Sequence, residues 1–160
     1  MGEHKDPADR SCNTVDDWIG NYPFDDAERA VLDIARRFFS AFSAPERHGW
    51  IGAFTQADRF FGPQGAALAY RILSTIQVLR STRMFDFSFI NPDCPCCREK
   101  ITAEERQFLF ILHALRRDRP AEATLNAMMV CSGHSPEPLV AATVLLSEDM
   151  ARVEALEPVA

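Results

Sequence analysis

The sequence predicts an all-α protein, and two observations support this prediction. From Trp18 onward, apolar residues recur at intervals of three and four, the period of a helix with one buried face. Residues that start or stop helices, namely aspartate, threonine, proline and glycine, flank these stretches. We therefore expect about six helices in a single compact, bundle-like domain. Residues 15–160 would form this domain, and the polar residues 1–14 a flexible tail.

Three helices are expected in the first half of the chain. The stretch 25–42 opens with a capping aspartate and carries an apolar stripe made of Val31, Ala35, Phe38 and Phe42. The next helix opens at Pro45 and is closed by Gly62. The third opens at Pro63, and its buried face would consist of Leu68, Ile72, Ile76 and Leu79.

Three further helices are expected after an extended connector. Residues 84–90, MFDFSFI, alternate like a strand but have no partner strand, so we expect them to press Phe85, Phe87 and Phe89 on the helical core. Thr102 and Glu105 have the spacing of a capping box, which predicts a helix over 102–117. A helix over 120–131 and another beginning at 136–138 complete the set. The stripe of the last helix is Leu139, Thr143, Leu146 and Met150.

Composition and charge exclude several classes of protein. The chain of 160 residues is 47% hydrophobic and 25% charged, as a globular protein is, and it has neither a membrane-spanning run nor a secretory signal. We expect a cytoplasmic protein, in which clustered cysteines favour metal ligands over disulfides. The net charge is −6, and only residues 61–120 are positive, with nine basic and six acidic side chains. These basic residues fit solvated helix faces, so nucleic-acid binding is not expected.

The cysteines form the main candidate site. Cys94 and Cys97 are spaced C-x-x-C in a proline turn, and Cys131 and His134 are spaced C-x-x-H. Two such pairs make up the ligand set of a Cys3His zinc site. The helix over 102–117 leads through Asp118, Arg119 and Pro120 directly into the helix over 120–131, so these helices must form an antiparallel hairpin. Its open end would bring both pairs together, which predicts a metal-stapled hairpin.

Cys96 leaves alternatives open. Side chains of adjacent residues in an extended turn point apart, so we do not expect Cys96 and Cys97 on the same zinc ion. An iron–sulfur cluster could instead use four thiolates, those of Cys94, Cys96, Cys97 and Cys131. A third alternative has no metal and uses the C-x-x-C dithiol in thiol exchange. Cys12, in the tail, is expected to be incidental.

The expected function is that of a non-enzymatic, metal-binding helical protein with a regulatory or adaptor role and an unidentified protein partner. A closed site with four protein ligands is typical of structural zinc. The alternative is an iron–sulfur redox or gas sensor or electron carrier, and an enzyme with an open metal site is a weaker third hypothesis. We name no catalytic residue. His113, in mid-helix, is expected to be a buried, hydrogen-bonded residue.

Overall fold

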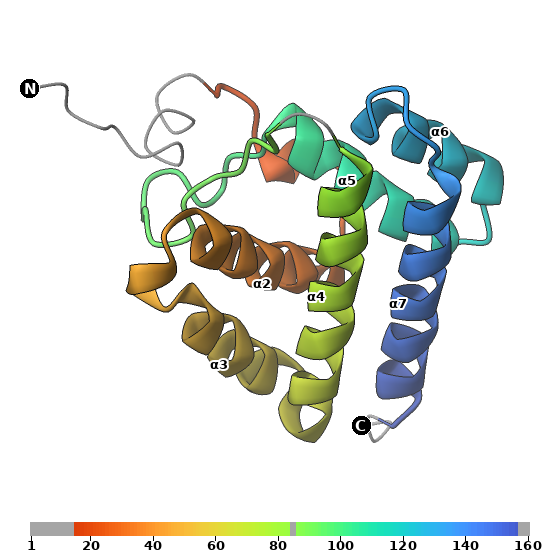
Figure 1. The fold of residues 1–160 in the computed structure, drawn as a ribbon. Coiled ribbons are helices and arrows are strands. Elements are labelled where there is room, and N and C mark those ends of the chain that lie inside the picture. Colours follow the sequence, from red (N-terminus) through yellow and green to blue (C-terminus); the bar gives the residue numbers. More distant parts are fainter. Residues whose placement is uncertain (1–14, 84–85, 157–160) are drawn as a thin grey trace, which may run out of the picture.

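Helices make up most of the computed structural model, which describes residues 15–83 and 86–156 (Figure 1). The α-helices are α2 (Asp26–Ser43), α3 (Gly49–Phe61), α4 (Gly65–Thr82), α5 (Ala103–Leu115), α6 (Pro120–Val130) and α7 (Glu137–Leu156). Short 3-10 turns are η1 (Ile19–Asn21), η2 (Pro45–Arg47) and η3 (Gly62–Gln64). Within these ranges no strand forms, and one isolated β-bridge joins Trp18 to Lys100. The all-α prediction is confirmed.

The helices pack as neighbouring pairs. The helix α2 packs on α3, α3 on α4, and α4 on α7, which runs alongside it (Figure 1). The helices α5 and α6 form the expected hairpin and pack on each other, and α5 also contacts α2 and α7. The first and second halves of the chain therefore meet where α4 packs on α7 and where α2 contacts α5. None of the helices in the described ranges has the length and apolar composition needed to cross a membrane.

The helix α5 is the most buried element of the core. Phe108, Leu109, Ile111 and Leu112 are all fully buried on it. A helix that packs against α2, α6 and α7 must be apolar around most of its circumference, and this one is.

Reciprocal capping boxes start both α2 and α5. In α5, the backbone N–H of Glu105 donates to Thr102 Oγ1 at 3.1 Å, and the Glu105 carboxylate accepts from the Thr102 N–H at 2.9 Å. This confirms the capping box that the sequence predicts. In α2, Asp25 and Glu28 form the same arrangement. The box helps to fix the start of α5 beside the cysteines.

The helix expected to open at Pro45 is interrupted. The turn η2 ends at His48, which has a left-handed backbone with φ of 50°, and α3 begins only at Gly49. A Cβ atom at Gly49 would lie 2.7 Å from the Arg37 carbonyl oxygen of α2. Glycine thus lets α3 approach α2 closely, and the chain must turn at His48 to enter that contact.

The connector before the cysteines is extended, as expected. Phe87 stacks on Phe39 of α2 with ring centroids 4.6 Å apart, and Phe89 lies against the same ring at 5.6 Å. Phe85 and the tail residues 1–14 lie outside the described residues. Two aromatic contacts on α2 therefore attach this segment to the core just ahead of the cysteines.

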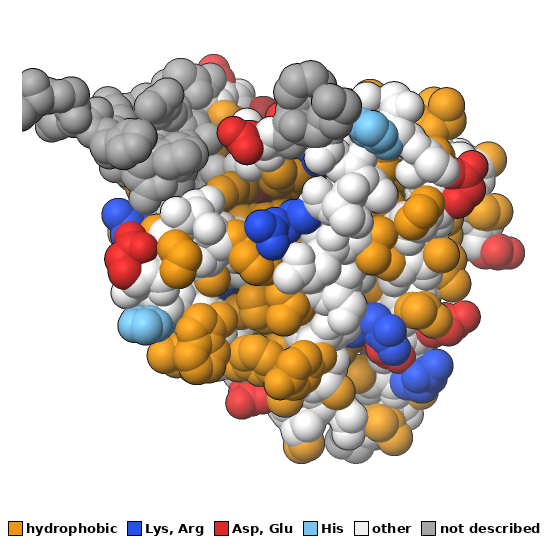
Figure 2. Space-filling view, viewed as in Figure 1, with side chains coloured by type: hydrophobic (Ala, Val, Ile, Leu, Met, Phe, Trp, Pro, Cys, Tyr) orange, Lys and Arg blue, Asp and Glu red, His pale blue; other side chains and the backbone are white. Residues whose placement is uncertain are grey.

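Large apolar side chains also remain on the surface. Figure 2 shows them gathered over α3 and the adjoining end of α4. They include Trp50, Ile51 and Phe60 of α3 and Tyr70 of α4, and a second exposed set, Leu125, Met128 and Met129, lies on α6.

Candidate metal centre

The cysteine loop, residues 91–100, is a series of tight turns between the phenylalanine connector and α5. The N–H groups of Cys97 and Arg98 both donate to the Cys94 carbonyl, at 3.2 and 3.1 Å. The Lys100 N–H donates to the Cys97 carbonyl at 2.8 Å. These hydrogen bonds curl the backbone, so the loop is not the extended turn that the sequence indicates.

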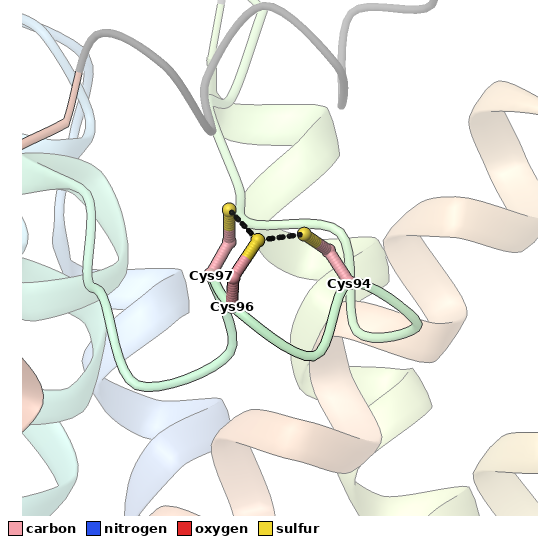
Figure 3. Close-up of side chains that lie close together, drawn as sticks. All are labelled: Cys94, Cys96 and Cys97. Atoms are coloured by element: carbon pink, nitrogen blue, oxygen red, sulfur yellow. Dashed lines mark hydrogen bonds between the residues drawn. The ribbon is translucent and has the colours of Figure 1, made fainter.

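The curled backbone gathers three sulfur atoms (Figure 3). Cys94 Sγ lies 3.2 Å from Cys96 Sγ, and Cys96 Sγ lies 3.5 Å from Cys97 Sγ. All three lie within 4.8 Å of one another. The expectation that Cys96 and Cys97 point apart is therefore wrong, because alternation of side chains holds for an extended backbone and this one is turned.

Arg36 of α2 holds the loop in place. Its Nη1 donates to the Arg98 carbonyl at 2.7 Å, and its Nη2 donates to the Lys100 carbonyl at 2.6 Å. Its Nε donates to the Glu105 carboxylate at 2.7 Å. One guanidinium therefore joins α2, the end of the cysteine loop and the first turn of α5.

Glu105 receives hydrogen bonds from both sides of the loop. Its carboxylate is fully buried and accepts from the backbone N–H of Ile90 at 3.0 Å, in addition to Thr102 and Arg36. The sequence analysis indicates only a capping role for Glu105 and no role for Arg36. A signal that Arg36 is buried is nevertheless present, because it lies between the apolar Leu32 and Phe39 at helical spacings of four and three.

The sulfur group faces outward on one side. Cys96 is exposed, Cys94 is half-buried and Cys97 is buried. The hydrogen bond with Cys94 and the electrostatic repulsion from it raise the pKa of the Cys96 thiol, an effect that nearby Lys100 partly offsets. Three sulfur atoms with one solvent-facing side could hold a metal ion and leave a coordination position open.

The sulfur spacing fits a thiophilic metal. Zn–S bonds of about 2.3 Å in a tetrahedron place sulfur atoms about 3.8 Å apart. The 3.2 and 3.5 Å separations between the sulfur atoms would need to widen by only a few tenths of an ångström.

Cys97 also takes part in a disulfide. Cys94, Cys96 and Cys131 carry reduced thiols. Cys12 lies outside the described residues. A disulfide sulfur is not a thiolate ligand, so metal binding by all three loop sulfurs requires the reduced form of Cys97.

Cys131 and His134 do not join the sulfur group in the described structure. Cys131 is fully buried at the end of α6, and its Sγ donates to Thr82 Oγ1 of α4 at 3.6 Å. His134 follows on an exposed turn. The metal-stapled hairpin is not confirmed. The end of α6 contacts the end of α4 through Cys131 and Thr82, and Arg83, which follows α4, donates to the Val130 carbonyl at 2.6 Å.

A second polar cluster involves His113, which is buried. Its Nδ1 lies 3.0 Å from a carboxylate oxygen of the fully buried Glu28, which also pairs with Arg116 and Arg117 at 2.8 and 2.7 Å. This cluster ties the start of α2 to the end of α5.

Comparison of the chain with protein-family models, with curated proteins and with solved structures finds no significant match. The case for a function therefore depends on the geometry of the site.

Proposed function

We propose that the chain is a metal-binding helical protein with a regulatory or adaptor role. In its reduced form, Cys94, Cys96 and Cys97 would bind Zn²⁺. The observation that carries the proposal is the convergence of three sulfur atoms within 4.8 Å on a loop that is anchored to the core. Zinc is favoured over a redox metal because it binds thiolates well and has no redox chemistry that would require an electron-transfer partner.

The ligand set leaves one coordination position open, which suits a partner that binds through the metal and equally an enzyme with an open metal site. A structural zinc site has four protein ligands, but this loop supplies three and exposes the sulfur of Cys96. The fourth position is open to water or to a side chain of another protein. The apolar side chains exposed over α3 and α4 also favour a protein partner.

An iron–sulfur cluster receives less support. Among the described residues, the fourth thiolate would have to come from Cys131, which is buried against Thr82. The zinc site that the sequence indicates, with Cys94, Cys97, Cys131 and His134, would likewise require the end of α6 to move to the cysteine loop.

Metal analysis of single cysteine variants separates these ligand sets. We expect the reduced wild-type chain, purified without oxygen, to be colourless and to hold zinc at a ratio near one. Cys96→Ser should lose most of this zinc, whereas Cys131→Ser, the matched control, and His134→Ala should keep it. Equal zinc in Cys96→Ser and wild type, together with loss in Cys131→Ser, would contradict the proposed site. A brown protein with iron would support the cluster.

A further inference from the structure

Two reduced thiols lie side by side on the cysteine loop. Cys94 Sγ lies 3.2 Å from Cys96 Sγ (Figure 3). Both residues carry reduced thiols, and Cys96 is exposed while Cys94 is half-buried. A small molecule that bonds to two neighbouring thiols can therefore reach this pair from solvent, and it needs no sulfur from Cys97.

The backbone of the loop holds the two thiols in place. Pro95 stands between the two cysteines, and its ring fixes the φ angle there. The Cys94 N–H donates to the Asn91 carbonyl at 3.2 Å, and the Cys94 carbonyl accepts from the Arg98 N–H at 3.1 Å. A ligand that bridges Cys94 and Cys96 therefore meets a preorganised pair, which reduces the entropy that is lost on binding.

The separation of the two sulfur atoms suits trivalent arsenic. This element bonds strongly to soft thiolate sulfur, makes three single bonds and keeps a lone pair, so its bond angles are narrower than those of a tetrahedral ion. Arsenic–sulfur bonds are no longer than zinc–sulfur bonds, so two sulfur atoms on arsenic lie closer together than the roughly 3.8 Å expected on zinc. The 3.2 Å between the sulfur atoms of Cys94 and Cys96 is on this shorter side.

We propose that Cys94 and Cys96 form a chelating site for trivalent arsenic compounds. With an organic arsenic oxide, each thiol sulfur bonds to arsenic and the arsenic–oxygen double bond breaks. The two thiol protons leave with that oxygen as one water molecule. Arsenic stays trivalent and neither sulfur is oxidised, so the step needs no oxidant or reductant. The second bond forms within the loop at a high effective concentration, which makes the bridged product resistant to competing monothiols.

The arsenic site overlaps the proposed zinc site but does not rest on it. Zinc would use the sulfur of Cys97 as well, whereas arsenic needs only the Cys94 and Cys96 pair. Cys131 is fully buried beside Thr82, away from the sulfur group, and so provides a thiol that should not take part. The two proposals can therefore fail separately.

Phenylarsine oxide tests the site on the full chain, purified without reductant and treated with a chelator to remove metal. Native mass spectrometry should show one phenylarsenic group per chain. Excess glutathione, a monothiol, should leave this adduct in place, and the dithiol dimercaptopropanol should remove it. Arsenic held by two thiols gives this pattern. Absence of the adduct, or its removal by glutathione, would overturn the proposal.

Alkylation of wild type locates the adduct without any substitution. The treated chain is labelled with iodoacetamide, reduced with dimercaptopropanol, labelled with N-ethylmaleimide and digested with trypsin. Cleavage after Arg83 and Arg98 yields one peptide, residues 84–98, that contains all three loop cysteines. Compared with the untreated chain, iodoacetamide labelling of both Cys94 and Cys96 should fall several-fold. Unchanged labelling of either residue would contradict the assignment, and a folding defect in a variant cannot obscure this result.

Three variants complete the design. Cys94→Ser and Cys96→Ser should each lower the glutathione-resistant adduct by about tenfold or more, because a single remaining thiol cannot chelate arsenic. Cys131→Ser, the matched control, should keep the adduct. A resistant adduct in Cys96→Ser equal to that of wild type would show that another pair of thiols is responsible. Zinc is measured separately on the reduced chain, so its loss or retention does not decide the arsenic result.

Discussion

Arg36 and Glu105 form a buried ion pair on which the position of the cysteine loop depends. The exposed fractions of their side chains are 4% and 0%, and the guanidinium contacts the carboxylate through both Nε and Nη2. Removing one partner of such a pair leaves a buried charge without compensation, which is far more costly than losing an exposed ion pair.

We therefore expect Arg36→Met to lower the free energy of unfolding by about 3 to 5 kcal/mol. The neighbouring Arg37 provides the control. It pairs with Asp33 one turn away and with the exposed Asp93 of the cysteine loop, and it is itself 23% exposed, so Arg37→Met should cost about 1 kcal/mol or less. Urea unfolding of both variants measures the difference. Equal losses would show that the buried pair has no special part in stability.

The surroundings of Glu28 indicate how the stability of the fold depends on pH. Burial alone would raise its pKa, but hydrogen bonds from His113, Arg117 and the Asp25 N–H outweigh burial, and the pKa of Glu28 is lowered. The pKa of Asp25 is lowered as well, since its backbone and arginine hydrogen bonds outweigh desolvation. The unfolded chain thus binds protons more readily than the folded chain, and stability falls as pH falls.

We expect the urea midpoint to be nearly constant from about pH 7 to pH 5 and to drop below about pH 4.5, as these carboxylates are protonated. Glu28→Gln should be less stable at neutral pH and should show a shallower decline in acid. Urea midpoints measured across this range test the prediction. If the urea midpoint of the variant fell as steeply in acid as that of wild type, groups other than Glu28 would be responsible for the loss of stability.

At the scale of elements, the capping box of α5 joins a helix to the loop before it. Thr102 Oγ1 accepts from the Glu105 N–H and donates to the Ser88 carbonyl at 2.7 Å. The same hydroxyl therefore fixes the first turn of α5 and the phenylalanine connector. The cysteine loop is held between these two attachments.

Thr102→Ala should lower the free energy of unfolding by about 1 to 2 kcal/mol, because a cap and a partly buried hydrogen bond are lost together. Thr124→Ala is a suitable control, since Thr124 Oγ1 only donates to the Pro120 carbonyl on an exposed face of α6. We expect this control to be within about 0.5 kcal/mol of wild type. Urea unfolding distinguishes the two, and similar losses would argue against a joint role for the Thr102 hydroxyl.

At the scale of the whole molecule, α5 is the central helix and the cysteine loop lies at the periphery. Leu109 and Ile111 are fully buried on α5, whereas Cys96 is exposed in its turn. Local opening of a protein begins where few apolar contacts are lost. Stability should therefore be uneven across the fold.

Native-state hydrogen exchange should reveal this unevenness. The amides of Leu109 and Ile111 should exchange only through global unfolding, and those within residues 94–97 should exchange much faster. Ile90 should be slow although it lies in a connector, because its N–H donates to the buried Glu105 carboxylate. Fast exchange at Ile90 would contradict the anchoring of the loop.

The sequence by itself determined the all-α class, the capping box at Thr102 and Glu105, the hairpin of α5 and α6, and the extended connector. These features depend on helical periodicity and on local hydrogen bonds, both of which act over a few residues. It also indicated the cysteine loop as the place where sulfur ligands could gather, since three of five cysteines lie within four positions.

Only the tertiary structure decided which thiols meet. The curled loop backbone brings Cys96 to Cys94 and Cys97, and packing against α4 takes Cys131 into the core beside Thr82. Arg36 and Glu105, distant in sequence, set the position of the loop through one buried ion pair. Local patterns cannot specify such contacts, because they depend on how helices from both halves of the chain pack around α5.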